Sequence, residues 1–170
     1  MDCRNCGAPM ELFAERRYYF CRYCGTFEFI DGPVVDGVQV LDRPIPAAPC
    51  PVCAGPLATA LLDDVYRVRH CEACRGLLIA CADFANAVAH RRSRESGPPT
   101  SPVPLDPRDL RRHLVCPSCR AAMDVHPYYG PGNVVIDTCS RCNLVWLDFG
   151  ELKQIAEAPG RDRRWIPLGE

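Results

Sequence analysis

The chain has 170 residues, of which 48% are hydrophobic and 24% charged, and its formal net charge is −1 at pH 7. These values are typical of a globular chain of one to three small domains. No apolar run approaches the roughly 18 residues of a membrane span, and no secretion signal precedes the first cysteines, so we expect a cytoplasmic protein without a membrane partner. Its 13 cysteines are the unusual feature, and in that compartment they should be reduced and metal-bound.

Twelve of the cysteines form six CxxC pairs, which group into three sets of four. A CxxC turn lets two thiolates face one metal, and two such loops complete a tetrahedron with metal–sulfur distances of about 2.3 Å. The two pairs of a set are 14, 17 or 19 residues apart, which is typical of four-cysteine zinc ribbons. The predicted ligands of three Zn²⁺ ions are Cys3, Cys6, Cys21 and Cys24; Cys50, Cys53, Cys71 and Cys74; and Cys116, Cys119, Cys139 and Cys142.

The first and shortest ribbon is predicted over residues 1–31. Gly7 and Gly25 each follow a CxxC pair, where a positive φ lets backbone N–H groups turn toward the sulfur atoms. The runs 17–20 and 26–30 are rich in aromatic residues, which favours strands. We expect a metal-bound hairpin here that is not followed by a helix.

A second ribbon followed by a helix is predicted over residues 49–92. Asp63 and Asp64 fit the reversal between two strands, and residues 65–70 fit the returning strand. The run 83–92 contains good helix formers with spaced apolar residues. The apolar set of this expected helix is Phe84, Ala87 and Val88.

The third ribbon is predicted within residues 108–158, after a short basic helix over 108–114. Its expected strands are 126–129, 134–138 and 144–147, with a reversal at 130–132. Asp148, followed three residues later by Glu151, is a helix-start signal. The helix that follows has an apolar stripe of Leu152, Ile155 and Ala156.

Three segments without CxxC pairs separate or follow the ribbons. Residues 32–48 predict a connector with a short added strand, because prolines limit the valine-rich stretch around Asp36 and Gly37 to a sheet edge or a linker. Residues 93–107 are rich in proline and lack periodicity, which is typical of a flexible linker. Residues 159–170 form an arginine- and tryptophan-containing tail without a partner in its own unit, which we expect to dock on a neighbouring ribbon or on another protein.

The run CSRCNLVWLDFGEL in the third ribbon resembles the transcription factor IIB-type zinc-ribbon family of bacterial proteins. The pattern of that family ends in a second CxxC, a short apolar strand with Trp, and Leu-Asp-x-Gly-Glu-Leu. The residues at the matching positions are Trp146, Leu147, Asp148, Gly150, Glu151 and Leu152. The resemblance implies a ribbon fold and a zinc site over about a quarter of the chain, and it implies little about activity.

The predicted fold class is therefore a small, metal-stabilised, β-rich protein of three tandem four-cysteine zinc ribbons, with short helices after the second and third. A unit of this size buries too little apolar surface to fold without a metal, so we expect the main role of the zinc to be structural. Cys81, the thirteenth cysteine, should pack as a small apolar residue. The histidines are scattered, and no phosphate-binding glycine loop or clustered carboxylate pair occurs, so we expect neither an enzyme nor a small-molecule substrate. These histidines are His70, His90, His113 and His126.

The expected function is that of a non-catalytic interaction module, in which rigid ribbons present strand edges and exposed aromatic side chains to a protein partner. The aromatic residues singled out for this role are Tyr128, Tyr129, Trp146 and Trp165. Trp146 fits the core of the third ribbon equally well.

Two alternative functions remain beside protein binding. Nucleic-acid binding is disfavoured by charge, because each metal with four thiolates carries −2 and three filled sites would bring the chain to roughly −7. Local arginine clusters could still contact phosphates, namely Arg91, Arg92 and Arg94; Arg108, Arg111 and Arg112; and Arg161, Arg163 and Arg164. An iron-binding redox protein is the less favoured alternative, because the loops between the CxxC pairs have ribbon rather than rubredoxin lengths.

Overall fold

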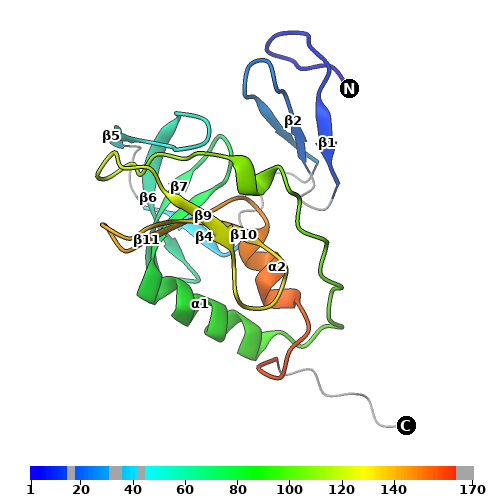
Figure 1. The fold of residues 1–170 in the computed structure, drawn as a ribbon, viewed down its shortest axis with the longest axis vertical. Helices are drawn as coiled ribbons and strands as arrows, with labels where there is room; N and C mark the ends of the chain where they lie inside the picture. The colour runs from blue at the N-terminus through cyan, green and yellow to red at the C-terminus, as the bar shows by residue number, and fades with distance from the viewer. Residues whose placement is uncertain (15–17, 31–35, 42–44, 164–170) are drawn as a thin grey trace. The chain divides into compact units, whose positions relative to one another are not determined.

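A computed structural model describes residues 1–14, 18–30, 36–41 and 45–163, and it is dominated by short antiparallel strands (Figure 1). The chain divides into two compact units, Met1–Leu77 and Leu78–Glu170. Three groups of four cysteines lie in this β-rich chain together with two α-helices, so the predicted fold class is confirmed. The boundaries predicted for the individual segments stay predictions. Within the described part, neither helix is both long and apolar enough to cross a membrane.

The first unit begins with a separate three-stranded sheet of the order β1-β2-β3. Its strands are β1 (Glu11–Phe13), β2 (Tyr18–Phe20) and β3 (Phe27–Phe29). The cross-strand register places aromatic rings next to one another, with centroids 4.8 to 6.2 Å apart. These rings belong to Phe13, Tyr18, Phe20, Phe27 and Phe29. Aromatic pairs at such distances stabilise a sheet that has no helix of its own.

The second ribbon is built around the longest strand of the first unit. Its strands are β4 (Val38–Val40), β5 (Ile45–Pro49), β6 (Pro56–Leu62) and β7 (Tyr66–Cys71). β6 and β7 form a hairpin whose turn contains Asp63 and Asp64, with φ of 54° and 61°, so the predicted reversal is confirmed. The predicted added strand is β4, and both β4 and β5 pair with β6. Val34 and Val35, the other half of the valine-rich stretch, lie outside the described residues.

The second unit combines a sheet with two helices. Its strands follow the order β8-β11-β10-β9, and β8 lies at the boundary of the unit. They are β8 (Leu77–Ala80), β9 (Asp124–Pro127), β10 (Val135–Cys139) and β11 (Leu144–Leu147). The helices α1 (Cys81–Arg94) and α2 (Glu151–Glu157) are the two predicted ones, and the predicted apolar residues of both are buried. The first predicted strand of this ribbon begins two residues earlier than expected, which leaves Tyr128 and Tyr129 in the turn.

The short helix expected over 108–114 was wrong. Only one 3₁₀ turn forms, η1 (Asp109–Arg111), and its N-cap position is Arg108. The predicted cap, Asp106, accepts a hydrogen bond from the backbone N–H of Arg108 at 2.8 Å, in the turn before η1. Arg112 has an extended backbone with φ −76° and ψ 153°. Its guanidinium group binds Asp137 on β10 and Asp148 after β11. The two partly buried ion pairs therefore override the weak helical propensity of a short segment.

Arg92, at the end of α1, is fully buried, with 0% of its surface exposed. Its guanidinium group donates hydrogen bonds to the carbonyl oxygens of Ile155 and Ala158 at 2.5 and 2.9 Å, and to the carboxylate of Asp162. The last carbonyl groups of a helix have no partner within it, so Arg92 caps α2 from a neighbouring helix. This residue belongs to a cluster that was a candidate for phosphate contact, and the structure assigns it to the interior instead.

Arg163 likewise corrects the expectation that the tail has no partner in its own unit. Its side chain is buried and donates to the carbonyl oxygens of Glu157 and Gly97. A carboxylate oxygen of Glu95 lies 3.6 Å from the same guanidinium group. The segment up to Arg163 therefore packs within the second unit, and Trp165 lies outside the described residues.

Replacing Arg92 by alanine should lower the free energy of unfolding by about 3 kcal/mol, because it leaves several buried carbonyl groups and one carboxylate without their donor. The matched control is Arg94→Ala, two residues along the same helix on an exposed side chain, where the change should stay within about 0.5 kcal/mol. Urea unfolding of the zinc-loaded chain measures both values. Equal stability of the two variants would contradict the role given to Arg92.

Candidate metal centres

The structure brings the twelve paired cysteines together as three groups of four, each drawn from two CxxC loops. Within every group the sulfur atoms lie within 4.8 Å of one another. Facing sulfur atoms of opposite loops are 3.4 to 3.6 Å apart, close to the roughly 3.8 Å edge of a tetrahedron with 2.3 Å zinc–sulfur bonds. The three groups thus support three Zn²⁺ sites, and we infer that all twelve thiolates are ligands.

One backbone conformation recurs in all six CxxC loops. In the loop of Cys3, the cysteine N–H donates to the carbonyl oxygen of Ala8 at 2.8 Å, and the N–H of Gly7 donates back to the carbonyl oxygen of Cys3 at 2.8 Å. The residue after each second cysteine has a left-handed φ, between 51° and 75°. These six residues are Gly7, Gly25, Ala54, Arg75, Arg120 and Asn143. The positive φ expected at the two glycines is confirmed. The other four were missed, because alanine and arginine do not indicate it and asparagine indicates it only weakly.

Hydrogen bonds from the loops support the charged form of individual thiols. The hydroxyl of Thr26 lies 3.1 Å from the sulfur of Cys24, and this contact, followed by one from the Thr26 backbone, lowers the pKa of Cys24 to about 6. A backbone hydrogen bond with Ala121 is the main reason that the pKa of Cys119 falls to about 7. Thiolates are the form that binds zinc, so these contacts prepare the groups for metal.

The three groups differ in burial. In the first, Cys3 and Cys21 are buried, whereas Cys6 and Cys24 are exposed. In the second, three cysteines are buried and one is half-buried, and in the third two are buried and two half-buried. The first site is therefore the one most open to water.

The third site is supported by the residues of the Leu-Asp-x-Gly-Glu-Leu motif. The indole N–H of Trp146 donates to Asp148 at 2.9 Å, and the backbone N–H of Asp148 donates to Glu151 at 2.7 Å. Gly150 precedes α2 with a φ of 87°, a left-handed conformation that glycine adopts without strain. Each polar group of the motif thus has a structural role in joining β11 to α2, and the helix-start signal is confirmed.

The remaining candidate ligands lie apart from these groups. His70 is buried beside Cys71, and burial lowers its pKa. His126 contacts the hydroxyl of Thr138 at 3.1 Å through Nε2. Cys81 is the first residue of α1, half-buried, and burial raises its pKa. Over the described ranges, no metal-sized group of three or more such side chains occurs besides the three cysteine groups.

Elemental analysis should find close to three zinc ions per chain, one for each group of four cysteines, in untagged protein purified without air or added metal. Cys81→Ser should keep all of them because that residue lies outside the groups, whereas Cys116→Ser should lose one. Iron in any site, or clearly fewer metal ions, would contradict the assignment.

A Gly25→Ala variant should bind zinc in the first site roughly tenfold more weakly, because a left-handed alanine costs about 1–2 kcal/mol. No atom lies within 4 Å of the Cβ that would be added, so the effect comes from the backbone alone. Gly25→Asn is the matched control, since Asn143 has the same conformation in the third site, and it should lose less affinity. Competition with a chromogenic chelator measures both, and wild-type affinity in the alanine variant would contradict the explanation.

Comparison of the sequence with known protein families identifies a zinc ribbon at the third site, in agreement with the geometry of its four cysteines. Residues 115–158 match the sequence model of the transcription factor zinc-finger family, of the TFIIB zinc-ribbon type. The match covers about a quarter of the chain, and it confirms for this segment the resemblance noted in the sequence. No curated protein and no solved structure matches the chain significantly. The third ribbon is thus similar to this family, whereas the first two ribbons are identified by their cysteine geometry.

Proposed function

We propose that this chain is a non-catalytic zinc-ribbon module that binds a protein partner through exposed aromatic side chains of its ribbons. The zinc-ribbon part of this proposal has the support of the family match and of the three four-cysteine groups. Four thiolates complete the tetrahedral shell of zinc and leave no position for a water or a substrate. A reducing compartment such as the cytoplasm suits such sites, because the thiolates stay available to the metal.

The observation that carries the proposal is the exposure of Tyr129. This side chain is 89% exposed, and its ring stacks on that of His126 with a centroid distance of 5.6 Å. The other described candidates are engaged internally, since Tyr128 packs edge-on against Phe84 at 5.4 Å and Trp146 is 0% exposed. An exposed, laterally supported tyrosine offers a large contact area at low entropic cost, which is why tyrosine is enriched at binding hot spots.

Nucleic-acid binding is the weaker alternative. Three arginines from the clusters that could have contacted phosphates, namely Arg92, Arg112 and Arg163, bind carboxylate or carbonyl oxygens of their own unit. The zinc–thiolate groups add negative charge to a chain that is already at −1. Phosphate recognition requires the opposite field, so a protein partner agrees better with the charges.

The decisive experiment is quantitative affinity purification with Tyr129→Ala, with Val65→Ala as the control on an exposed side chain elsewhere. Truncation of a tyrosine hot spot costs about 2 kcal/mol, so the partner retained by the wild type and the control should fall by roughly thirtyfold. Equal recovery from all three proteins would overturn the assignment of Tyr129. Salt-dependent binding of DNA or RNA by the purified chain would favour the alternative.

A truncation that tests the tail as a docking element must keep the contacts that Asp162 and Arg163 make within the second unit. Removal of residues 159–170 would delete Asp162 and Arg163, which bind α1 and the segment that follows it, and would therefore destabilise the second unit as well. Removal of residues 164–170 alone leaves those contacts intact. Loss of the partner from this shorter truncation, with full recovery by Tyr129→Ala, would assign the docking role to the tail instead.

A further inference from the structure

The first group of four cysteines differs from the other two in the accessibility of its sulfur atoms. Cys6 and Cys24 are exposed, whereas none of the eight cysteines in the second and third groups is exposed. The residues between and beside them are exposed too, including Arg4, Asn5 and Tyr23. A small molecule in solution can therefore reach two thiolates of this site directly.

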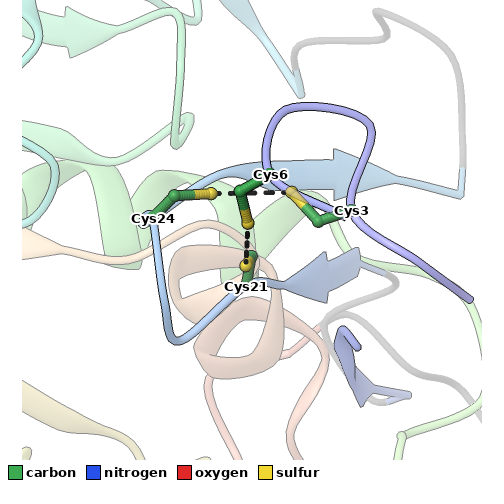
Figure 2. A group of neighbouring side chains, drawn as sticks. All are labelled: Cys3, Cys6, Cys21 and Cys24. Carbon is green, nitrogen blue, oxygen red and sulfur yellow. Dashed lines mark hydrogen bonds between the residues drawn. The ribbon is translucent and has the colours of Figure 1, made fainter. Parts of the chain in front are cut away.

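Each exposed cysteine of the group faces a buried cysteine from the opposite loop (Figure 2). The sulfur of Cys6 lies 3.5 Å from that of Cys21, and the sulfur of Cys24 lies 3.5 Å from that of Cys3. The arrangement is that of an accessible thiol with a second thiol in contact, which is typical of cysteines that oxidise reversibly to disulfides. In the other groups Cys53 faces Cys71 at 3.4 Å and Cys119 faces Cys139 at 3.6 Å, but Cys53 and Cys119 are half-buried rather than exposed.

We propose that the first zinc site is a peroxide-reactive site, in which oxidation of its cysteines to disulfides releases the metal. An exposed thiolate, of Cys6 or Cys24, attacks one oxygen of hydrogen peroxide, which breaks the O–O bond and gives a sulfenic acid and hydroxide. The facing buried thiolate, of Cys21 or Cys3, then attacks that sulfur and displaces a second hydroxide. Two thiolates have been oxidised and one peroxide reduced, and zinc leaves because it has lost two of its ligands.

The consequence of this reaction falls mainly on the first ribbon, which contacts the second through the guanidinium group of Arg75, 3.8 Å from the ring centroid of Phe29. The sheet β1-β2-β3 is hydrogen-bonded separately from the strands of the other ribbons, so loss of the first metal does not break the hydrogen bonds of their sheets. A ribbon this small depends on its metal for folding. Its release should therefore loosen the cluster of five rings that includes Tyr18, while the other ribbons stay folded.

The test uses the zinc-loaded full chain, titrated with hydrogen peroxide in the presence of a chromogenic zinc chelator. One of the three zinc equivalents should be released before the others, and peptide mapping after alkylation should find the first disulfides among Cys3, Cys6, Cys21 and Cys24. Added thiol reductant and zinc should restore the metal content. The Cys81→Ser variant, which lacks the cysteine outside the groups, should give the same titration.

Two results would overturn the proposal. One is release of zinc from the second or third site before the first, or from all sites together, since the exposure of Cys6 and Cys24 would then have no effect. The other is retention of all zinc at peroxide concentrations that oxidise Cys81. Because metal and disulfides are measured separately, neither result depends on the partner-binding function.

Discussion

The attraction of one divalent metal for four thiolates is the interaction on which each ribbon depends. The chain contains three ribbons, and the described residues of the first form a three-stranded sheet of short strands with a cluster of aromatic rings. Such a unit loses more conformational entropy than its buried surface can offset, whereas a structural zinc site contributes about 10–16 kcal/mol. This dependence explains why the same CxxC backbone recurs six times, even where Ala54, Arg75 or Arg120 must adopt a left-handed conformation. The local cost at each loop is small beside the energy of the metal.

In the second unit, arginine side chains hold together elements that the metal site does not connect. Arg112 joins the segment before the third ribbon to Asp137 and Asp148, and Arg92 joins α1 to the end of α2. The carboxylates of Asp148, Glu151 and Asp137 raise the pKa of Arg112 against the opposing effect of its burial, so the group stays charged. Replacing one partner of such a largely buried ion pair leaves the other charge without compensation, which destabilises the fold more than the intact pair stabilises it. The unit thus owes its arrangement to charged side chains as well as to its apolar core.

Much of the fold could be predicted from local patterns. The cysteine spacings identified the three groups, the Asp63-Asp64 reversal identified a hairpin, and the pair Asp148 and Glu151 identified the start of α2. The interactions that could not be predicted act across long sequence separations. Nothing near Arg92 indicates that its partner Asp162 lies 70 residues away, and a surface arginine and a buried one look alike in a basic stretch. The same limit explains the wrong helix at 108–114, where distant carboxylates outweigh local propensity.

The separation between Arg92 and its partners also matters while the chain is being made. Domains generally fold as they emerge from the ribosome, the N-terminal ones first. α1 is synthesised before Ile155, Ala158 and Asp162, so the guanidinium group of Arg92 has none of these partners when it is made. The ring of Phe84 likewise precedes its partner Tyr128. The nascent chain can load its first two zinc ions during that interval. The first two groups of four cysteines are complete once Cys74 has been made, whereas the contacts of the second unit are complete only after Asp162.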